Sequence, residues 1–211
     1  MSLPLSKLLD PADFVELAEE LAIVDRRFHL AAEQHPMRRW EYAMALRAIR
    51  IREQIVTIAY DIGGAGSPFQ YMWGTLVVDP NDGGLTLAMF IHDNPRLADV
   101  VTCLSVLEHV DDLDQFCYHL SCLVAPGGLL FLTMDACACP SHAADLEVAD
   151  PPDRHHFHWM RKRMFGRVDR RALAERFLAL QFSWLGDCDF MWCGAHVYDY
   201  AFASLALVKR P

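Results

Sequence analysis

The chain opens with two stretches in which apolar residues return every three or four positions. In the first, Asp10 and Pro11 precede a run whose inward-facing positions are Phe14, Leu17, Ala18, Leu21 and Val24. This spacing predicts a helix that Asp10 caps. The break at His35-Pro36 ends it, and a second helix is predicted over residues 37–52, with its own stripe of Trp40, Ala43, Met44, Arg47 and Ile51. Residues 1–53 are therefore expected to form a helical extension.

The pattern then changes to short apolar runs that alternate with helical segments. Strands are predicted at residues 55–60, 75–78, 85–91, 100–105, 129–134, 182–185 and 200–208, and helices at 68–72, 113–123 and 170–180, the last capped by Asp169. Strands that alternate with crossovers predict an α/β fold with a parallel sheet. The connection from Asp79 to Asp93 contains Gly83-Gly84 and is too short for an ordinary crossover helix, which predicts a trimmed version of this fold.

We expect one domain over residues 1–211. Residues 54–135 form its core, residues 136–168 read as a long loop rich in proline and small residues, and residues 169–211 hold a last helix and two strands. Long loops in compact domains are usually functional, so this one is a candidate lid or acceptor-side loop.

Four sequence features mark the ends of the predicted core strands. The run 56–60 leads into Asp61 and a loop that contains Gly63, Gly64 and Gly66. A second strand ends at Asp79-Pro80, a third leads through Leu104-Ser105 to Glu108-His109, and Pro126-Gly127-Gly128 precedes the next. In open α/β sheets ligands bind beyond the carboxyl ends of strands, so these segments are the candidate site.

This order of features resembles the class I S-adenosylmethionine-dependent methyltransferases, particularly their small type 11 group. The resemblance implies a Rossmann-like, seven-stranded sheet that is parallel except for an antiparallel C-terminal strand. It spans residues 55–133 closely and the C-terminal part more loosely. The sequence departs from the family pattern where Ala65 and Ser67 stand at the second and third glycines of the loop.

The resemblance also implies where the cofactor S-adenosylmethionine binds. Asp61 with Gly63, Gly64 and Gly66 would face its methionine end, Asp79 with Pro80 its ribose hydroxyls, and the backbone of Leu104-Ser105 would pass beneath the methionine. Asp93 would stand near the adenine amino group. Turn roles remain open for Asp79, which begins an Asp-Pro-Asn-Asp-Gly turn sequence, and for Asp93 before Asn94-Pro95.

Catalytic and acceptor residues are less defined, because methyl transfer mainly requires alignment of the acceptor and exclusion of water. His109, beside Glu108, is either a general base or part of a local loop cap, and the pair is our catalytic candidate. Trp40, Tyr42, His158 and Trp159 are candidate acceptor-pocket residues, with core packing the alternative for Trp40. No metal is predicted: the cysteine and histidine spacing is poor for zinc, and Ser105 stands where cation-binding relatives carry an acid.

Charge and composition limit the classes of molecule that this protein is expected to bind. The 211 residues carry a formal net charge of −9, which argues against duplex nucleic acid as the main partner. We expect a cytoplasmic protein without a membrane partner, because the cysteines are scattered and odd in number and the sequence shows neither a secretory signal nor an apolar run long enough to cross a membrane. The N-terminal helices allow a homodimer. We expect methyl transfer to a small-molecule, glycan or peptide acceptor; the alternative is a catalytically silent binding or scaffold protein with the same fold.

Overall fold

The computed structural model describes residues 4–28, 36–63, 69, 75–78, 86–94, 96–137, 167–189 and 200–211. Its helices are α1 (Asp13–Glu16), α2 (Ala18–Phe28), α3 (Pro36–Ile51), α4 (Leu87–Asp93), the short 3-10 helix η2 (Leu107–His109), α5 (Leu113–Leu123) and α7 (Arg167–Ala179). Its strands are β1 (Ser6–Lys7), β2 (Ala59–Ile62), β3 (Leu76–Val78), β4 (Ala98–Leu104), β5 (Val124–Cys137), β6 (Phe182–Trp184), β7 (Cys188–Asp189) and β8 (Tyr200–Lys209).

A six-stranded sheet of order β3-β2-β4-β5-β8-β6 forms the centre of the described chain. β2 pairs in parallel with both β3 and β4, and β4 pairs in parallel with β5. β8 is antiparallel to both of its neighbours, β5 and β6, so it alone runs against the others. The predicted α/β sheet with an antiparallel C-terminal strand is confirmed.

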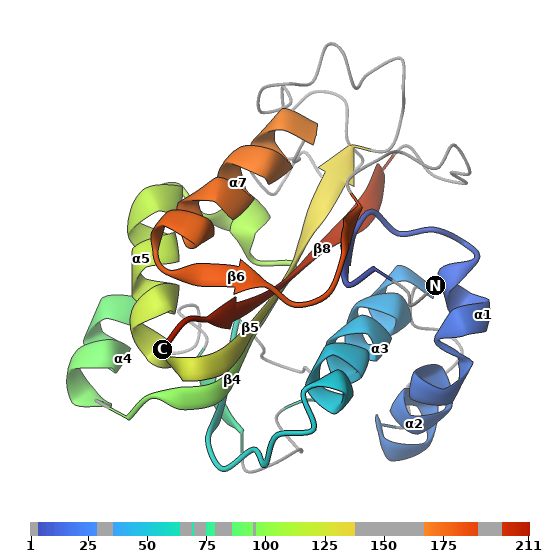
Figure 1. Ribbon diagram of the computed structural model, residues 1–211, viewed down its shortest axis with the longest axis horizontal. Coiled ribbons are helices and arrows are strands. Elements are labelled where there is room, and N and C mark those ends of the chain that lie inside the picture. The colour runs from blue at the N-terminus through green and yellow to red at the C-terminus, as the bar shows by residue number, and fades with distance from the viewer. Residues whose placement is uncertain are drawn as a thin grey trace.

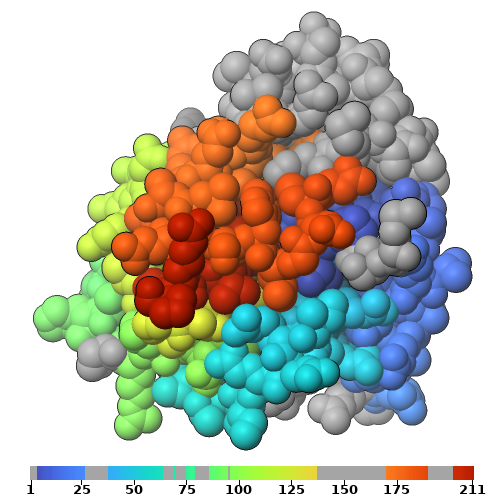
Figure 2. Space-filling model, in the orientation of Figure 1, coloured from blue at the N-terminus to red at the C-terminus, as the bar shows by residue number. Residues whose placement is uncertain are grey.

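Helices cover both faces of this sheet (Figure 1). α4, α5 and α7 lie on one side, and α3 with the N-terminal helices lies on the other. Figure 2 shows the same division at the surface: the blue N-terminal helices and the cyan segment that follows α3 are on one flank, and the green α4 and α5 are on the opposite flank. The sheet interior is apolar, with Val101, Leu130 and Leu132 fully buried, as burial on both faces requires.

The strand predicted at residues 85–91 is wrong, because this segment is helix α4. Thr86 caps the helix, its side-chain oxygen accepting a hydrogen bond from the backbone N–H of Met89 at 3.2 Å. Leu87 and Phe90, three positions apart, are both buried, and Phe90 packs edge-on against Tyr60 with the ring centroids 5.1 Å apart. The described sheet therefore has six strands rather than seven, and α4 is the crossover from β3 to β4.

Other boundaries shift by a few residues. β2 begins at Ala59 rather than residue 55, and the preceding Ile55 is 83% exposed. α5 has its predicted bounds, but β5 starts at once at Val124 rather than at residue 129, so Pro126-Gly127-Gly128 lies inside the strand. α7 begins at Arg167, which puts Asp169 inside the helix instead of at its cap. The first predicted helix is divided at Leu17 into α1 and α2.

Salt bridges join α2 to α3 in the N-terminal layer. Glu20, which is buried, accepts hydrogen bonds from the guanidinium groups of Arg47 and Arg50, each at 2.7 Å. Arg50 also contacts Glu19 at 3.0 Å, and this pair is exposed. The two helices therefore pack as one unit, and the buried Glu20 is the centre of their contact.

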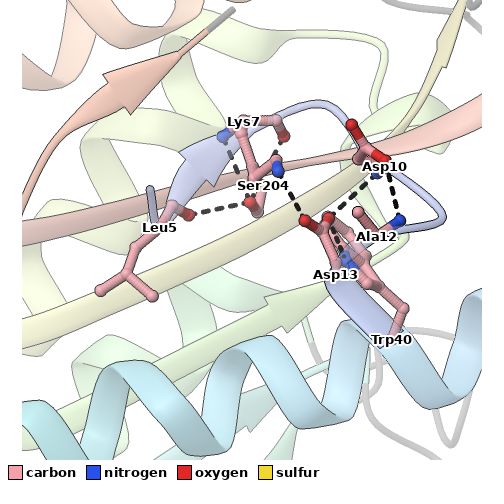
Figure 3. A network of polar contacts seen from close by, with 7 residues as sticks. All are labelled: Leu5, Lys7, Asp10, Ala12, Asp13, Trp40 and Ser204. Atoms are coloured by element: carbon pink, nitrogen blue, oxygen red, sulfur yellow. Dashed lines mark hydrogen bonds and ion pairs between the residues drawn. The ribbon is translucent and has the colours of Figure 1, made fainter. Parts of the chain in front are cut away.

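A polar network attaches the start of the chain to this layer and to β8 (Figure 3). The Ser204 hydroxyl donates to the carbonyl of Leu5 at 2.8 Å. The buried Asp13 carboxylate accepts hydrogen bonds from the Lys7 ammonium at 2.6 Å and from the Trp40 indole N–H at 2.9 Å. Strand β1 also pairs with β7 in a parallel two-stranded sheet that the sequence did not predict. No helix in the described ranges has the length and apolarity to cross a membrane.

A turn before β2 depends on Asp99, whose side-chain oxygen accepts hydrogen bonds from the backbone N–H of Thr57 (2.8 Å), the Thr57 hydroxyl (2.6 Å) and the N–H of Ile58 (3.0 Å). Burial raises the pKa of Asp99, but these hydrogen bonds outweigh it, so its pKa lies below the ordinary value. The ionised carboxylate is thus the form that stabilises the fold.

We predict that Asp99→Ala lowers the free energy of unfolding by about 1–3 kcal/mol, since hydrogen bonds to a charged group are lost. Urea denaturation at neutral pH measures this, with Asp111→Ala, an exposed aspartate, as control. The difference from wild type should be complete above pH ~4, the ordinary range of an unfolded aspartate, and vanish as pH falls through the lowered folded-state pKa. Equal destabilisation by both variants would contradict the role of Asp99.

Candidate functional site

The carboxyl end of β2 carries the first two predicted cofactor residues. Asp61 is fully buried, and its Oδ1 accepts a hydrogen bond from the Thr102 hydroxyl of β4 at 2.7 Å. Gly63 follows with φ +71°, and its N–H donates to the carbonyl of Val78 at 2.7 Å. A Cβ at this position would lie 2.3 Å from Cγ2 of Val106, so the chain has no room for a side chain here.

Three parallel strands end side by side at this edge. Ile62 of β2 is in register with Val78 of β3 and with Cys103 of β4. Leu104 and Ser105, both buried, follow at the end of β4. The loop residues Gly64 and Gly66, and Asp79 with Pro80, lie outside the described residues.

Ser105 is held by a contact that the sequence did not predict. Its backbone is left-handed, with φ +52°, and its hydroxyl donates to Oε1 of Glu41 at 2.6 Å. The Thr133 hydroxyl of β5 donates to the same Glu41 oxygen. Glu41 is fully buried on α3, so a carboxylate of the N-terminal layer reaches the end of β4 and the neighbouring Thr133 within β5. Its signal in the sequence is an acid beside Trp40 within an apolar helical stretch.

Two more buried carboxylates surround the same region. Glu108 of η2 and Asp135 of β5 are 2% and 3% exposed. Arg38, one turn before Glu41 on α3, contacts Oε2 of Glu41 at 3.1 Å. Burial acts to lower the pKa of Arg38, but the carboxylates of Glu41, Glu108 and Asp135 outweigh it and raise that pKa. The guanidinium therefore stays charged among these three acids.

The catalytic candidates differ in their exposure. Glu108 is buried, whereas His109 is exposed, and the His109 backbone N–H donates to the carbonyl of Val106 at 2.9 Å. Both lie in η2, directly after the Ser105 turn. His109 is therefore an exposed residue of the short helix that follows the end of β4.

The remaining candidates are placed less favourably. Asp93 ends helix α4 instead of a strand, and its side chain is 61% exposed beside His92. The position at a strand end that motivated its adenine contact is therefore absent. Trp40 is fully buried and hydrogen-bonded to Asp13, which fits the core-packing alternative. His158 and Trp159 lie outside the described residues.

Tyr42 packs against Phe69, which follows the glycine loop in the sequence. The two rings meet edge-on, with their centroids 5.9 Å apart. Burial, reinforced by the Glu41 carboxylate, raises the pKa of Tyr42 to about 12, so the phenol stays protonated. The described ranges contain no group of three or more His, Cys, Asp or Glu side chains arranged to hold a metal ion.

Comparison with known proteins identifies the family. A model of the family described as "Methyltransferase domain" matches residues 67–183, more than half of the chain. The chain belongs to this family. This match and the fold confirm the prediction of a class I S-adenosylmethionine-dependent methyltransferase.

Solved structures similar to this methyltransferase share its fold at low sequence identity. The N-methyltransferase NodS from Bradyrhizobium japonicum WM9 is 15% identical with a TM-score of 0.54, and the match covers 85% of this chain and 99% of NodS. A second NodS structure, in complex with S-adenosyl-L-homocysteine, has a TM-score of 0.51 at 13% identity over 94% of this chain and 98% of NodS. An S-adenosylmethionine-dependent methyltransferase from Clostridium acetobutylicum ATCC 824 is 11% identical with a TM-score of 0.51, over 94% and 100% of the two chains.

A short sequence match adds one curated relative. The ubiquinone biosynthesis O-methyltransferase of Colwellia psychrerythraea is 49% identical over 41 residues, which are 19% of this methyltransferase and 17% of that protein. The match thus spans about a sixth of the relative's length. It supports the family and leaves the acceptor open.

We predict that Gly63→Ala destabilises this methyltransferase by about 2–4 kcal/mol, from the strain of a left-handed alanine together with the overlap with Val106. Gly186→Ala is the matched control: Gly186 has φ +72°, but a Cβ there meets nothing within 4 Å. It should lose only about 1–2 kcal/mol. Chemical denaturation of both variants measures the difference, and equal losses would show that contact with Val106 is unimportant.

Proposed function

We propose that this methyltransferase binds S-adenosylmethionine at the ends of β2, β3 and β4 and transfers its methyl group to a small-molecule, glycan or peptide acceptor. One observation carries the proposal: β2 lies between β3 and β4 in the sheet. The chain therefore goes from β2 to β3 on one side of β2, and then from β3 to β4 on its other side. Open α/β sheets bind ligands at such a switch point, in the crevice outside the strand ends.

The residues present fit this cofactor. Gly63 has a left-handed backbone and packs against Val106, so the chain turns sharply at the end of β2, where the proposed cofactor loop begins. Asp61 and the glycines would face the amino and carboxylate groups of the methionine end. Asp79 directly follows Val78, the last residue of β3. A carboxylate at this position can accept hydrogen bonds from both ribose hydroxyls. The Leu104-Ser105 backbone would pass beneath the methionine.

Little side-chain chemistry is then required. The bound cofactor supplies an electrophilic methyl group on its sulfonium, so the protein has to align the acceptor and exclude water. His109 is the candidate that would remove a proton from an acceptor hydroxyl or amine, because its side chain is exposed beside the strand ends. Glu108, buried in the same turn, would orient η2 rather than contact the acceptor.

The acceptor class follows from charge and similarity. A net charge of −9 disfavours duplex nucleic acid. The short match to an O-methyltransferase and the fold shared with an N-methyltransferase support testing small phenols and small amines first. The altered glycine loop, with Ala65 and Ser67, favours the second candidate function: a protein that binds the cofactor without turnover.

We predict that Asp79→Ala weakens binding of S-adenosylhomocysteine about 10–100-fold, because two hydrogen bonds to a charged acceptor are lost. Isothermal titration calorimetry measures this. Asp82→Ala removes the same charge three residues later in the same turn sequence and should change the affinity less than about threefold. Equal effects would reject the ribose role of Asp79, and a wild-type protein that binds neither S-adenosylmethionine nor its product would reject the function itself.

We predict that His109→Asn lowers methyl transfer about 10²–10⁴-fold while binding of S-adenosylhomocysteine stays near wild type. The assay follows a radiolabelled methyl group from S-adenosylmethionine into panels of phenols and amines. His119→Asn, on α5, is the control. Unchanged turnover in the His109 variant would assign this residue to the loop cap alone. Cofactor binding without transfer to any acceptor by the wild type would favour the silent alternative.

A further inference from the structure

Glu41 of α3 has a carboxylate that accepts hydrogen bonds both from the turn after β4 and from Thr133 within β5. Its Oε1 accepts hydrogen bonds from the hydroxyls of Ser105 and Thr133, and its Oε2 pairs with Arg38. The Arg38 guanidinium lies 5.6 Å from the ring centre of Phe202 on β8. Glu41 therefore connects the helical layer to the strands that the proposed cofactor would contact.

The turn at Ser105 needs hydrogen bonds that hold its left-handed backbone. Serine disfavours a left-handed backbone, because its Cβ crowds the following carbonyl. At φ +52° Ser105 is held by three bonds: its N–H lies within hydrogen-bond distance of the Thr133 carbonyl (3.2 Å) and hydroxyl (3.1 Å), and its own hydroxyl donates to Glu41. Since Thr133 also donates to Glu41, one carboxylate orients both side chains that hold the turn.

Holding a charge here is costly for the fold. Glu41 is completely buried, and burial raises its pKa despite the opposing effects of Arg38, Ser105 and Thr133. A buried ion pair often contributes less stability than well-packed apolar side chains of the same volume. Stability alone is therefore a poor explanation for a carboxylate here, whereas its hydrogen bonds to Ser105 and Thr133 put it beside the turn after β4.

We propose that Glu41 is a positioning residue for the cofactor: it holds the Ser105 turn in the left-handed conformation on which the methionine end of S-adenosylmethionine rests. This inference depends on the proposed function. Glu41 acts through Ser105 and Thr133 and does not itself contact the cofactor.

Four variants test the inference. Glu41→Ala removes the carboxylate, and Glu41→Gln keeps one acceptor oxygen for the hydroxyls. Glu20→Gln is the matched control, because Glu20 is a buried carboxylate that pairs with Arg47 and Arg50 on the same helix α3. The double variant Glu41→Ala with Ser105→Gly tests whether glycine, which adopts positive φ freely, keeps the turn at residue 105 in place without Glu41.

Two measurements are made on folded protein. Calorimetry gives the affinity for S-adenosylhomocysteine, and NMR gives amide hydrogen exchange at Ser105 and Val106. Glu41→Ala should weaken the affinity about tenfold and Glu41→Gln about threefold, in proportion to the hydrogen bonds lost. Exchange at the turn should accelerate in Glu41→Ala. Glu20→Gln should leave the affinity and this exchange unchanged, and the double variant should recover most of the lost affinity.

Two outcomes would overturn the inference: unchanged exchange at Ser105 and Val106 in Glu41→Ala, or an affinity loss in Glu20→Gln equal to that in Glu41→Gln. An affinity that Ser105→Gly does not recover would also count against it, because Glu41 would then act by another route. Failure of the proposed function is a separate result, since it appears as absent binding in the wild type. Even if the wild type binds no cofactor, amide hydrogen exchange at Ser105 and Val106 still shows whether Glu41 holds the turn.

Discussion

The parallel hydrogen-bonded pairing of β2 with β3 on one side and β4 on the other is the constraint on which the site depends. The register puts Ile62 opposite both Val78 and Cys103, so three strands end at one edge and point the same way. Helices occupy both faces of the sheet, and this leaves the edge as the place where the main chain can meet a ligand. At this edge Gly63 lies so close to Val106 that a side chain would not fit between them.

Several buried polar groups gather near the same edge of the sheet. Asp61, Thr102, Ser105 and Thr133 are all buried, and so are Glu108 and Asp135. Such groups are costly to bury without partners, and the Thr102 hydroxyl bonded to Asp61 and the Ser105 and Thr133 hydroxyls bonded to Glu41 show how this cost is offset. Many of the buried polar groups thus lie near the proposed site, while others, such as Asp13 and Glu20, fix the N-terminal layer.

The N-terminal layer is part of this arrangement rather than an appendage. Trp40 and Glu41 are neighbours on α3 but face different partners: Trp40 bonds to Asp13 near the start of the chain, and Glu41 bonds to Ser105 and Thr133 of the sheet. The first residues are in turn fixed to β8 through Ser204. One helix therefore connects the beginning of the chain, the sheet and the strand ends.

The sequence alone determined the order of most elements, because apolar runs and turn residues specify them locally, and it indicated the family through the resemblance of its motifs. Helix α5 was predicted with its observed bounds, and β3 and β4 to within a few residues. Only the tertiary structure decided that residues 87–93 form a helix, since a short apolar run suits either state until Phe90 meets Tyr60. The contact of Glu41 with Ser105 and Thr133, 64 and 92 residues away, was equally hidden. Periodicity records which side of an element is apolar, but the partner of a buried charge depends on how separate layers pack.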